Sequence, residues 1–219
     1  MSIQQNPLLK ELSLFLKTLN LPTDYFFIVY GSHASNENSD NSDVDVFLAI
    51  EHNDEKIFTK LRDFIISFHH KHRLELDEEV PYENKLIVSF EDIDDAVKLK
   101  PFITKHEDGY AVPAVQKEAA FLGSRDIRLR LILNALTSPH QFISGEKGRY
   151  EKVKTEAENA VMLLGKRLSG KKEPTGDEVF EALTEGPRGE KNEWWLGYKT
   201  DKPAVYNYLK ELIERHETI

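Results

Sequence analysis

The clearest hydrophobic pattern in the chain predicts two strands joined by a tight turn. Residues 25–30 form a continuous run of aromatic and β-branched side chains, which is typical of a strand buried on both faces. The run ends at Gly31 and Ser32, where the backbone can turn and donate hydrogen bonds. Residues 43–50 begin by alternating acidic and apolar side chains, which predicts a second strand.

The second strand brings two carboxylates together. Because strand side chains point to opposite faces in turn, Asp43 and Asp45 share one face with Phe47, and the apolar residues between them share the other. Two like charges at this spacing repel. A magnesium ion is the simplest cation that would neutralise them, since it prefers hard oxygen ligands and is held by one or two carboxylates plus substrate phosphates. The turn at Gly31 and Ser32 offers backbone N–H groups and a hydroxyl to phosphate oxygens, so the pattern favours a metal-bound nucleoside triphosphate.

Helical and strand periodicity continues on both sides of these two strands. Asn6 and Pro7 suit the start of a first helix, because asparagine is a good N-cap and proline fits the first helical position. The patterns predict helices over 6–20, from Asn53 or Asp54 to residue 72, and over 91–100. They predict a strand over 73–80, and a further strand or a segment packed on the sheet over 86–90. A turn at 107–109 marks the expected end of the sheet region near residue 110.

Beyond residue 110 the pattern becomes helical. It predicts helices over 113–122, 124–136, 145–168, 177–184 and 203–215. A length of 219 residues allows one large domain or two modest ones. We therefore expect a sheet domain at 1–110 and a helical domain at 111–219.

Composition narrows the class of protein. Hydrophobic residues make up 40% and charged residues 31% of the chain, and no apolar run reaches membrane-spanning length, which favours a soluble globular protein with no membrane partner. The N-terminus shows no secretory pattern, so a cytoplasmic location is expected. The chain has no cysteine, which excludes disulfides and thiol catalysis. A net charge of −9 argues against long nucleic acid as the main partner.

The motif around the two strands resembles that of a known family. Gly31-Ser32, followed about ten residues on by Ser42-Asp43-Val44-Asp45, resembles the GS…SDxD signature of the nucleotidyltransferase superfamily, which includes DNA polymerase beta and the kanamycin and lincosamide nucleotidyltransferases. The resemblance is close over 24–50 and looser over 51–100. At 33–36 the chain has His-Ala-Ser-Asn, whereas small members often have Arg-Ala-Arg-Gly. The implied fold is α+β: a small mixed sheet flanked by helices, followed by a mainly α-helical C-terminal region.

The resemblance also implies the site residues and the cofactor. Asp43 and Asp45 would hold Mg²⁺, and a third carboxylate on a neighbouring strand would complete a two-metal site. The family pattern of a hydrophobic-x-hydrophobic-Asp run ahead of a Val-Pro pair favours Asp77 for this position, with Glu75 as the alternative. Asp43, Asp45 and Asp77 are thus the expected catalytic and metal-binding residues.

The reaction implied by the resemblance is the transfer of a nucleoside monophosphate from a nucleoside triphosphate to an acceptor hydroxyl, with release of pyrophosphate. Gly31 and Ser32 would bind the triphosphate, and ATP is the expected donor. The acidic charge and the helical second half favour a small-molecule acceptor. Two alternatives stay open: a macromolecular acceptor, either a protein partner as in toxin–antitoxin pairs or an RNA 3′ end, and an inactive relative that binds nucleotide without turnover.

Several other residues carry two interpretations each. His69, His70 and His72 close the second predicted helix, where they are metal ligands or, as we favour, cations placed at a helix C-terminus. Basic residues of the later helices, above all Arg149 and Lys152, either meet the triphosphate or belong to a solvated surface. The adjacent tryptophans at 194–195 either stack on a ring of the substrate or anchor a loop, and anchoring is the expected role.

Overall fold

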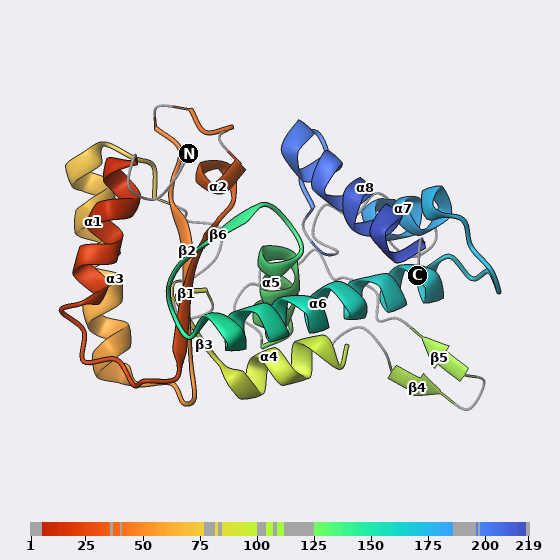
Figure 1. The fold of residues 1–219 in the computed structure, drawn as a ribbon, viewed down its shortest axis with the longest axis horizontal. Coiled ribbons are helices and arrows are strands. Elements are labelled where there is room, and N and C mark those ends of the chain that lie inside the picture. Colours follow the sequence, from red (N-terminus) through yellow and green to blue (C-terminus); the bar gives the residue numbers. More distant parts are fainter. Residues whose placement is uncertain are drawn as a thin grey trace. The chain divides into compact units, whose positions relative to one another are not determined.

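A computed structural model gives the fold of the protein. It describes residues 6–35, 37–39, 41–76, 82, 85–99, 104–106, 109–111, 125–185, 196 and 198–217. The elements in chain order are α1 (Pro7–Leu16), β1 (Tyr25–Tyr30), α2 (Ser32–Ser35), β2 (Asp45–Ile50), α3 (Glu55–His72), β3 (Ile87–Ser89), α4 (Phe90–Val97), β4 (Thr104–His106), β5 (Gly109–Ala111), α5 (Arg125–Leu136), β6 (His140–Gly145), α6 (Lys147–Leu168), α7 (Gly176–Glu185) and α8 (Pro203–Glu217) (Figure 1).

The chain divides into two compact units. The first comprises Met1–Phe90 and His140–Glu151, and the second comprises Glu91–Pro139 and Lys152–Ile219. The first unit holds a four-stranded sheet in the order β3-β2-β1-β6, and the second holds most of the later helices and the small β4–β5 hairpin. The expected α+β class is confirmed. The domain division at residue 110 stays a prediction.

The four-stranded sheet is mixed. β1 pairs antiparallel with β2 on one side and with β6 on the other, while β2 and β3 are parallel. The register places Tyr30, the last residue of β1, opposite Asp45, the first residue of β2. The strand pattern over 25–30 and 45–50 is therefore confirmed. Asp45, at the start of β2, lies beside the end of β1.

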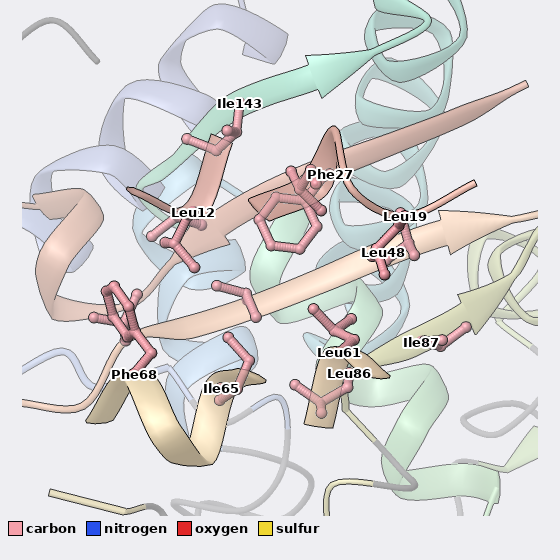
Figure 2. Close-up of a cluster of buried hydrophobic side chains, with 14 of the residues drawn as sticks. Leu12, Leu19, Phe27, Leu48, Leu61, Ile65, Phe68, Leu86, Ile87 and Ile143 are labelled. Atoms are coloured by element: carbon pink, nitrogen blue, oxygen red, sulfur yellow. The ribbon is translucent and has the colours of Figure 1, made fainter. Parts of the chain in front are cut away.

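Two helices cover one face of this sheet. α1 starts at the N-cap Asn6, whose Oδ1 accepts from the backbone N–H of Leu8 at 3.0 Å, and α3 starts at the N-cap Asp54 in the same way. Figure 1 shows both helices beside β1 and β2. Their apolar stripes meet the sheet in one buried cluster, in which Figure 2 labels Leu12, Leu19, Phe27, Leu48, Leu61, Ile65, Phe68, Leu86, Ile87 and Ile143.

Aromatic residues fill the other face of the sheet. The ring of Phe26 lies 6.0 Å from that of Phe47, 6.1 Å from Phe90 and 5.8 Å from Tyr150, between ring centroids. Phe47 alternates with Val46, which is buried in the cluster of the helix-covered face. This arrangement confirms that Asp45 and Phe47 share a face, as the period of two requires.

One edge strand of the sheet was not predicted. β6 lies where the sequence pattern gave only the start of a helix at residue 145. Gly145 instead ends the strand with φ 111°, and a Cβ there would lie 2.7 Å from the Cα of Phe26, so β1 approaches too closely for a side chain. The helix α6 begins two residues later, and Glu146 caps it by accepting from the backbone N–H of Gly148 at 3.2 Å.

The third predicted strand is wrong for the residues that the structure describes. Arg73 is in the left-handed conformation with φ 57° and ends α3, and residues 74–76 are not in a strand. The strand that pairs with β2 on the side away from β1 is β3, which lies within the run predicted at 86–90. Several predictions concern residues outside those that the structure describes: Asp77, residues 78–80, the helix expected at 113–122 and the tryptophans at 194–195.

The second unit is built mainly from helices. The predictions for 124–136, 177–184 and 203–215 correspond to α5, α7 and α8, and α6 covers most of the predicted 145–168. α7 and α8 pack together through the rings of Phe180 and Tyr206, 5.1 Å apart, and Lys210 Nζ lies 2.6 Å from Asp177 Oδ1. Within the described part of the chain, no helix has both the length and the apolar character that crossing a membrane requires.

Candidate functional site

The turn after β1 brings the backbone against a carboxylate. Gly31 has φ 72°, a left-handed conformation that glycine adopts without steric cost. A Cβ built on Gly31 would lie 2.5 Å from Asp45 Oδ2, so any side chain at position 31 would collide with that carboxylate. Ser32 follows at once and begins the single turn α2. Gly31, Ser32 and Asp45, which the motif singled out, therefore lie together at one end of β1 and β2.

Asp43, the other aspartate of the motif, lies just before the start of β2. Asp43 and Asp45 are both half-buried, whereas Val44 and Val46 between and after them are buried in the cluster beneath the helices. Val46 points into that cluster, so its strand neighbour Asp45 points to the opposite face, and Asp43 lies two residues ahead of the strand. Two positions along an extended chain place their Cα atoms about 7 Å apart.

A buried histidine ties the turn to the aspartate loop. His33, in α2, is 5% exposed, and its Nε2 donates to the backbone carbonyl of Ser42 at 2.9 Å. Since a carbonyl only accepts, this ring nitrogen carries the proton. His33 therefore connects the turn at Gly31 to Ser42, the residue before Asp43. Many small members of the family that the motif resembles have an arginine at this position.

A second buried histidine holds the same loop from α3. The backbone N–H of Val44 donates to Nε2 of His69 at 3.0 Å, and the His69 side chain is 2% exposed. The pKa of His69 is lowered to about 4, chiefly by burial and in smaller part by the nearby Lys85, His33 and His70. The ring is therefore neutral at pH 7, with Nε2 as acceptor. The interpretation of His69 as a cation at the helix end is wrong.

The neutral His69 makes the free energy of unfolding depend on pH. Its pKa is about 4 in the folded chain, against the ordinary histidine value of 6.5, so the unfolded chain binds the proton more readily between these values. Stability from this group is complete above pH 6.5 and is lost as the pH falls toward 4. We expect a loss of about 2 kcal/mol between pH 7.5 and pH 5. Urea unfolding of wild type and His69→Gln checks this: the variant should lack this part of the slope, and equal slopes would contradict it.

The third carboxylate is less defined than the other two. Asp77 lies outside the described residues. Glu75 is exposed, and its backbone N–H donates to the carbonyl of Asn41 at 2.7 Å, which places residue 75 beside the loop that leads to Asp43. The assignment of the third position to Asp77, with Glu75 as the alternative, stays a prediction.

The basic residues of the later helices have local partners. Arg149 Nη1 lies 3.0 Å from Asp24 Oδ2, and the guanidinium stands 3.8 Å from the centroid of the Phe90 ring. Asp24 precedes β1, so Arg149 belongs to the opposite end of that strand from Gly31, about 20 Å along it. Lys152 pairs with Glu156 four residues on, at 3.8 Å. These contacts favour the interpretation as a surface of ion pairs.

The sequence reasoning missed His33 and His69 as parts of the site. A signal for His69 was present, because it follows Ile65 by four residues and therefore continues the apolar stripe of α3. A polar residue on a buried stripe needs a hydrogen-bond partner, and here the partner is the backbone of the aspartate loop. His33 carries no such periodic signal, since α2 is a single turn.

The donor atoms at this end of the sheet fit a hard divalent cation. Asp43 and Asp45 are both half-buried, and the Asp45 carboxylate lies directly against Gly31, in the space that a side chain there would fill. Magnesium is usually held by one or two carboxylates together with substrate phosphates, which is the set that Asp43 and Asp45 would provide. In the described ranges, no three His, Asp or Glu side chains gather into a group that could hold a metal ion.

Comparison with known proteins identifies the family of the chain. The family model described as the nucleotidyltransferase domain matches residues 9–119, slightly more than half of the chain, and includes Gly31, Asp43, Asp45 and His69. The chain belongs to the nucleotidyltransferase domain family. Membership supports nucleotidyl transfer as the general reaction and a nucleoside triphosphate as substrate. Searches of the curated proteins and of the solved structures found no match.

Proposed function

We propose that the protein is a cytoplasmic, Mg²⁺-dependent enzyme that transfers a nucleoside monophosphate, with ATP as the expected donor, to the hydroxyl of a small-molecule acceptor. The observation that carries the proposal is the contact of Gly31 with the Asp45 carboxylate. A turn that can donate backbone N–H groups to phosphate oxygens lies directly against a carboxylate that can bind a metal. A triphosphate with its metal needs both within a few ångströms.

The chain's residues would act mainly by binding and orienting the reactants. Asp43 and Asp45 would hold the divalent metal, while Gly31 and Ser32 bind the triphosphate. When bound, Mg²⁺ neutralises the phosphate oxygens and lowers the barrier to displacement at phosphorus. Asp77 would lie on the acceptor side of the site.

The proposed step conserves atoms and charge. The acceptor oxygen forms a bond to the α-phosphorus, and the bond from that phosphorus to the oxygen of the pyrophosphate group breaks. The hydroxyl proton passes to water, and pyrophosphate leaves with its electron pair. The half-buried aspartates would hold the metal-bound phosphate at the end of β1 and β2, where an acceptor can approach.

The reaction class is tested with labelled nucleotides. The purified protein is incubated with each α-labelled nucleoside triphosphate and Mg²⁺, with and without cell extract as the acceptor pool, and with a chelator as control. We expect metal-dependent transfer of label into products of small size, together with pyrophosphate release. Label in protein or RNA would instead support the macromolecular alternative. Nucleotide binding without transfer in any extract would overturn the proposal in favour of an inactive relative.

Replacing the third carboxylate separates its two candidates. We expect Asp77→Asn to lose most transfer activity and Glu75→Gln to retain it, because the exposed Glu75 side chain is assigned no metal contact. Initial rates at saturating Mg²⁺ measure both variants side by side. An inactive Glu75→Gln beside an active Asp77→Asn would move the third position to Glu75.

A further inference from the structure

We propose that His69 is a positioning residue for nucleotidyl transfer: by accepting the Val44 N–H, its buried imidazole fixes the backbone between Asp43 and Asp45. His33 acts on the other side of Asp43, where it donates to the Ser42 carbonyl. We call His33 and His69 the histidine clamp. The inference rests on the proposed function, because it concerns how the metal-binding pair of that function is oriented.

The clamp acts where the sheet stops fixing the chain. The β1–β2 ladder ends at the pair of Tyr30 and Asp45, so Asp43 lies beyond the last paired residue. The backbone on each side of Asp43 is instead held by the two histidines, at 2.9 Å from Ser42 and at 3.0 Å from Val44. The backbone from which the Asp43 carboxylate projects is therefore held on both sides by these two side-chain contacts.

The two histidines come from elements that are themselves well anchored. His33 lies in α2, directly after the Gly31 turn, and its exposed fraction is 5%. His69 lies in the last turn of α3, next to Phe68, which is 1% exposed and belongs to the main cluster. Both the phosphate-binding turn and the helix-covered core are thereby connected to the aspartate loop.

The hydrogen-bonding state of His69 is unusual for a side chain that only fills a core. Its Nε2 must be unprotonated to accept from Val44, so the proton is on Nδ1. Among the residues that the structure describes, none accepts a hydrogen bond from this buried Nδ1. Buried polar atoms are normally paired, and within the described residues the ring makes its hydrogen bond to Val44 and none through Nδ1. This is expected where the loop position matters for the site.

Loss of the acceptor should show first in metal dependence. Groups that orient metal ligands change metal affinity or activity by about 10- to 100-fold when they are removed. We therefore expect His69→Leu to raise the Mg²⁺ concentration for half-maximal transfer by about tenfold or more, with a smaller change in nucleotide KM. His69→Gln, whose side-chain oxygen can accept from Val44 at a similar reach, should stay within about threefold of wild type.

A matched control lies one turn from His69. His72 ends the same helix, but its Nε2 contacts Glu11 Oε2 at 3.0 Å on the surface of α1. His72→Leu removes a histidine from α3 without touching the aspartate loop, so its Mg²⁺ dependence should equal that of wild type. Thermal unfolding of all three variants shows whether each is folded.

Three results would overturn the inference. The first is a folded His69→Leu variant whose Mg²⁺ dependence equals that of wild type. The second is a His69→Gln variant whose Mg²⁺ dependence is changed as much as that of His69→Leu. The third is a His69 ring that carries its proton on Nε2 in the wild-type protein. The last is read from the ¹⁵N chemical shifts of His69 at pH 7, which require neither a variant nor activity. If wild type binds Mg²⁺ but transfers nothing, the proposed function fails. The clamp is then judged by those shifts and by the exchange rate of the Val44 amide, which His69→Leu should raise at least tenfold.

Discussion

Replacing Asp45 with asparagine is expected to reduce nucleotidyl transfer by about 10³-fold or more while leaving the fold intact. The amide has nearly the shape of the carboxylate but no charge, so the metal would lose an anionic ligand that stabilises several kcal/mol of transition-state charge. Asp43→Asn is expected to have an effect of similar size. Both residues are half-buried, and neither belongs to the main hydrophobic cluster, so the substitutions should change the melting temperature little.

Asp54→Asn is the matched control for this pair. Asp54 accepts from the backbone N–H groups of Lys56 and Ile57 as the N-cap of α3, and asparagine caps helices about as well as aspartate. Asp54→Asn makes the same chemical change as Asp43→Asn and Asp45→Asn, but at a residue outside the proposed site. It should transfer at the wild-type rate. Near-normal transfer by Asp43→Asn or Asp45→Asn would remove the metal role from that residue.

Gly31→Ala is the second substitution with a large expected effect. The methyl group would lie 2.5 Å from Asp45 Oδ2, so either the carboxylate or the turn must move, and the positive φ is itself unfavourable for alanine. A displacement of about 1 Å in a reacting group can cost about 100-fold in rate. We expect transfer to fall by about that factor or more, with about 1–2 kcal/mol lost from the free energy of unfolding.

Gly170→Ala separates the collision from the backbone strain. Gly170 is also left-handed, with φ 66°, but an added Cβ there has no atom within 4 Å among the described residues. Its stability loss should match the strain part of Gly31→Ala, and its transfer rate should equal that of wild type. Kinetics and urea unfolding of both variants provide the comparison. A Gly31→Ala enzyme as active as Gly170→Ala would mean that the contact with Asp45 does not serve the site.

Much of the sheet core could be predicted because its signals are local. The run at 25–30 is buried at every residue after Tyr25, and the helix starts at Asn6 and Asp54 are set by side chains that cap their own helices. The motif likewise joins Gly31 to Asp45 through a short hairpin-like connection, so their proximity follows from the register of two consecutive strands.

The errors have physical causes that no local pattern contains. β6 pairs with β1 across more than 100 residues of chain, and the strand at 73–80 was predicted from alternation that Arg73 interrupts by closing α3 in a left-handed turn. His69 was interpreted from its place at a helix end, whereas its protonation is set by tertiary burial against the aspartate loop. In each case the deciding contact is distant in sequence.

We propose that the Gly31 turn and the two aspartates together hold a metal-bound nucleoside triphosphate. The most direct test is diffraction from crystals grown with Mn²⁺ and a triphosphate analogue that cannot be cleaved at the α-phosphorus. The account predicts an anomalous Mn²⁺ peak within bonding distance of carboxylate oxygens of both Asp43 and Asp45, with the triphosphate against Gly31 and Ser32. A metal peak away from both carboxylates, or a nucleotide bound elsewhere on the chain, would contradict it.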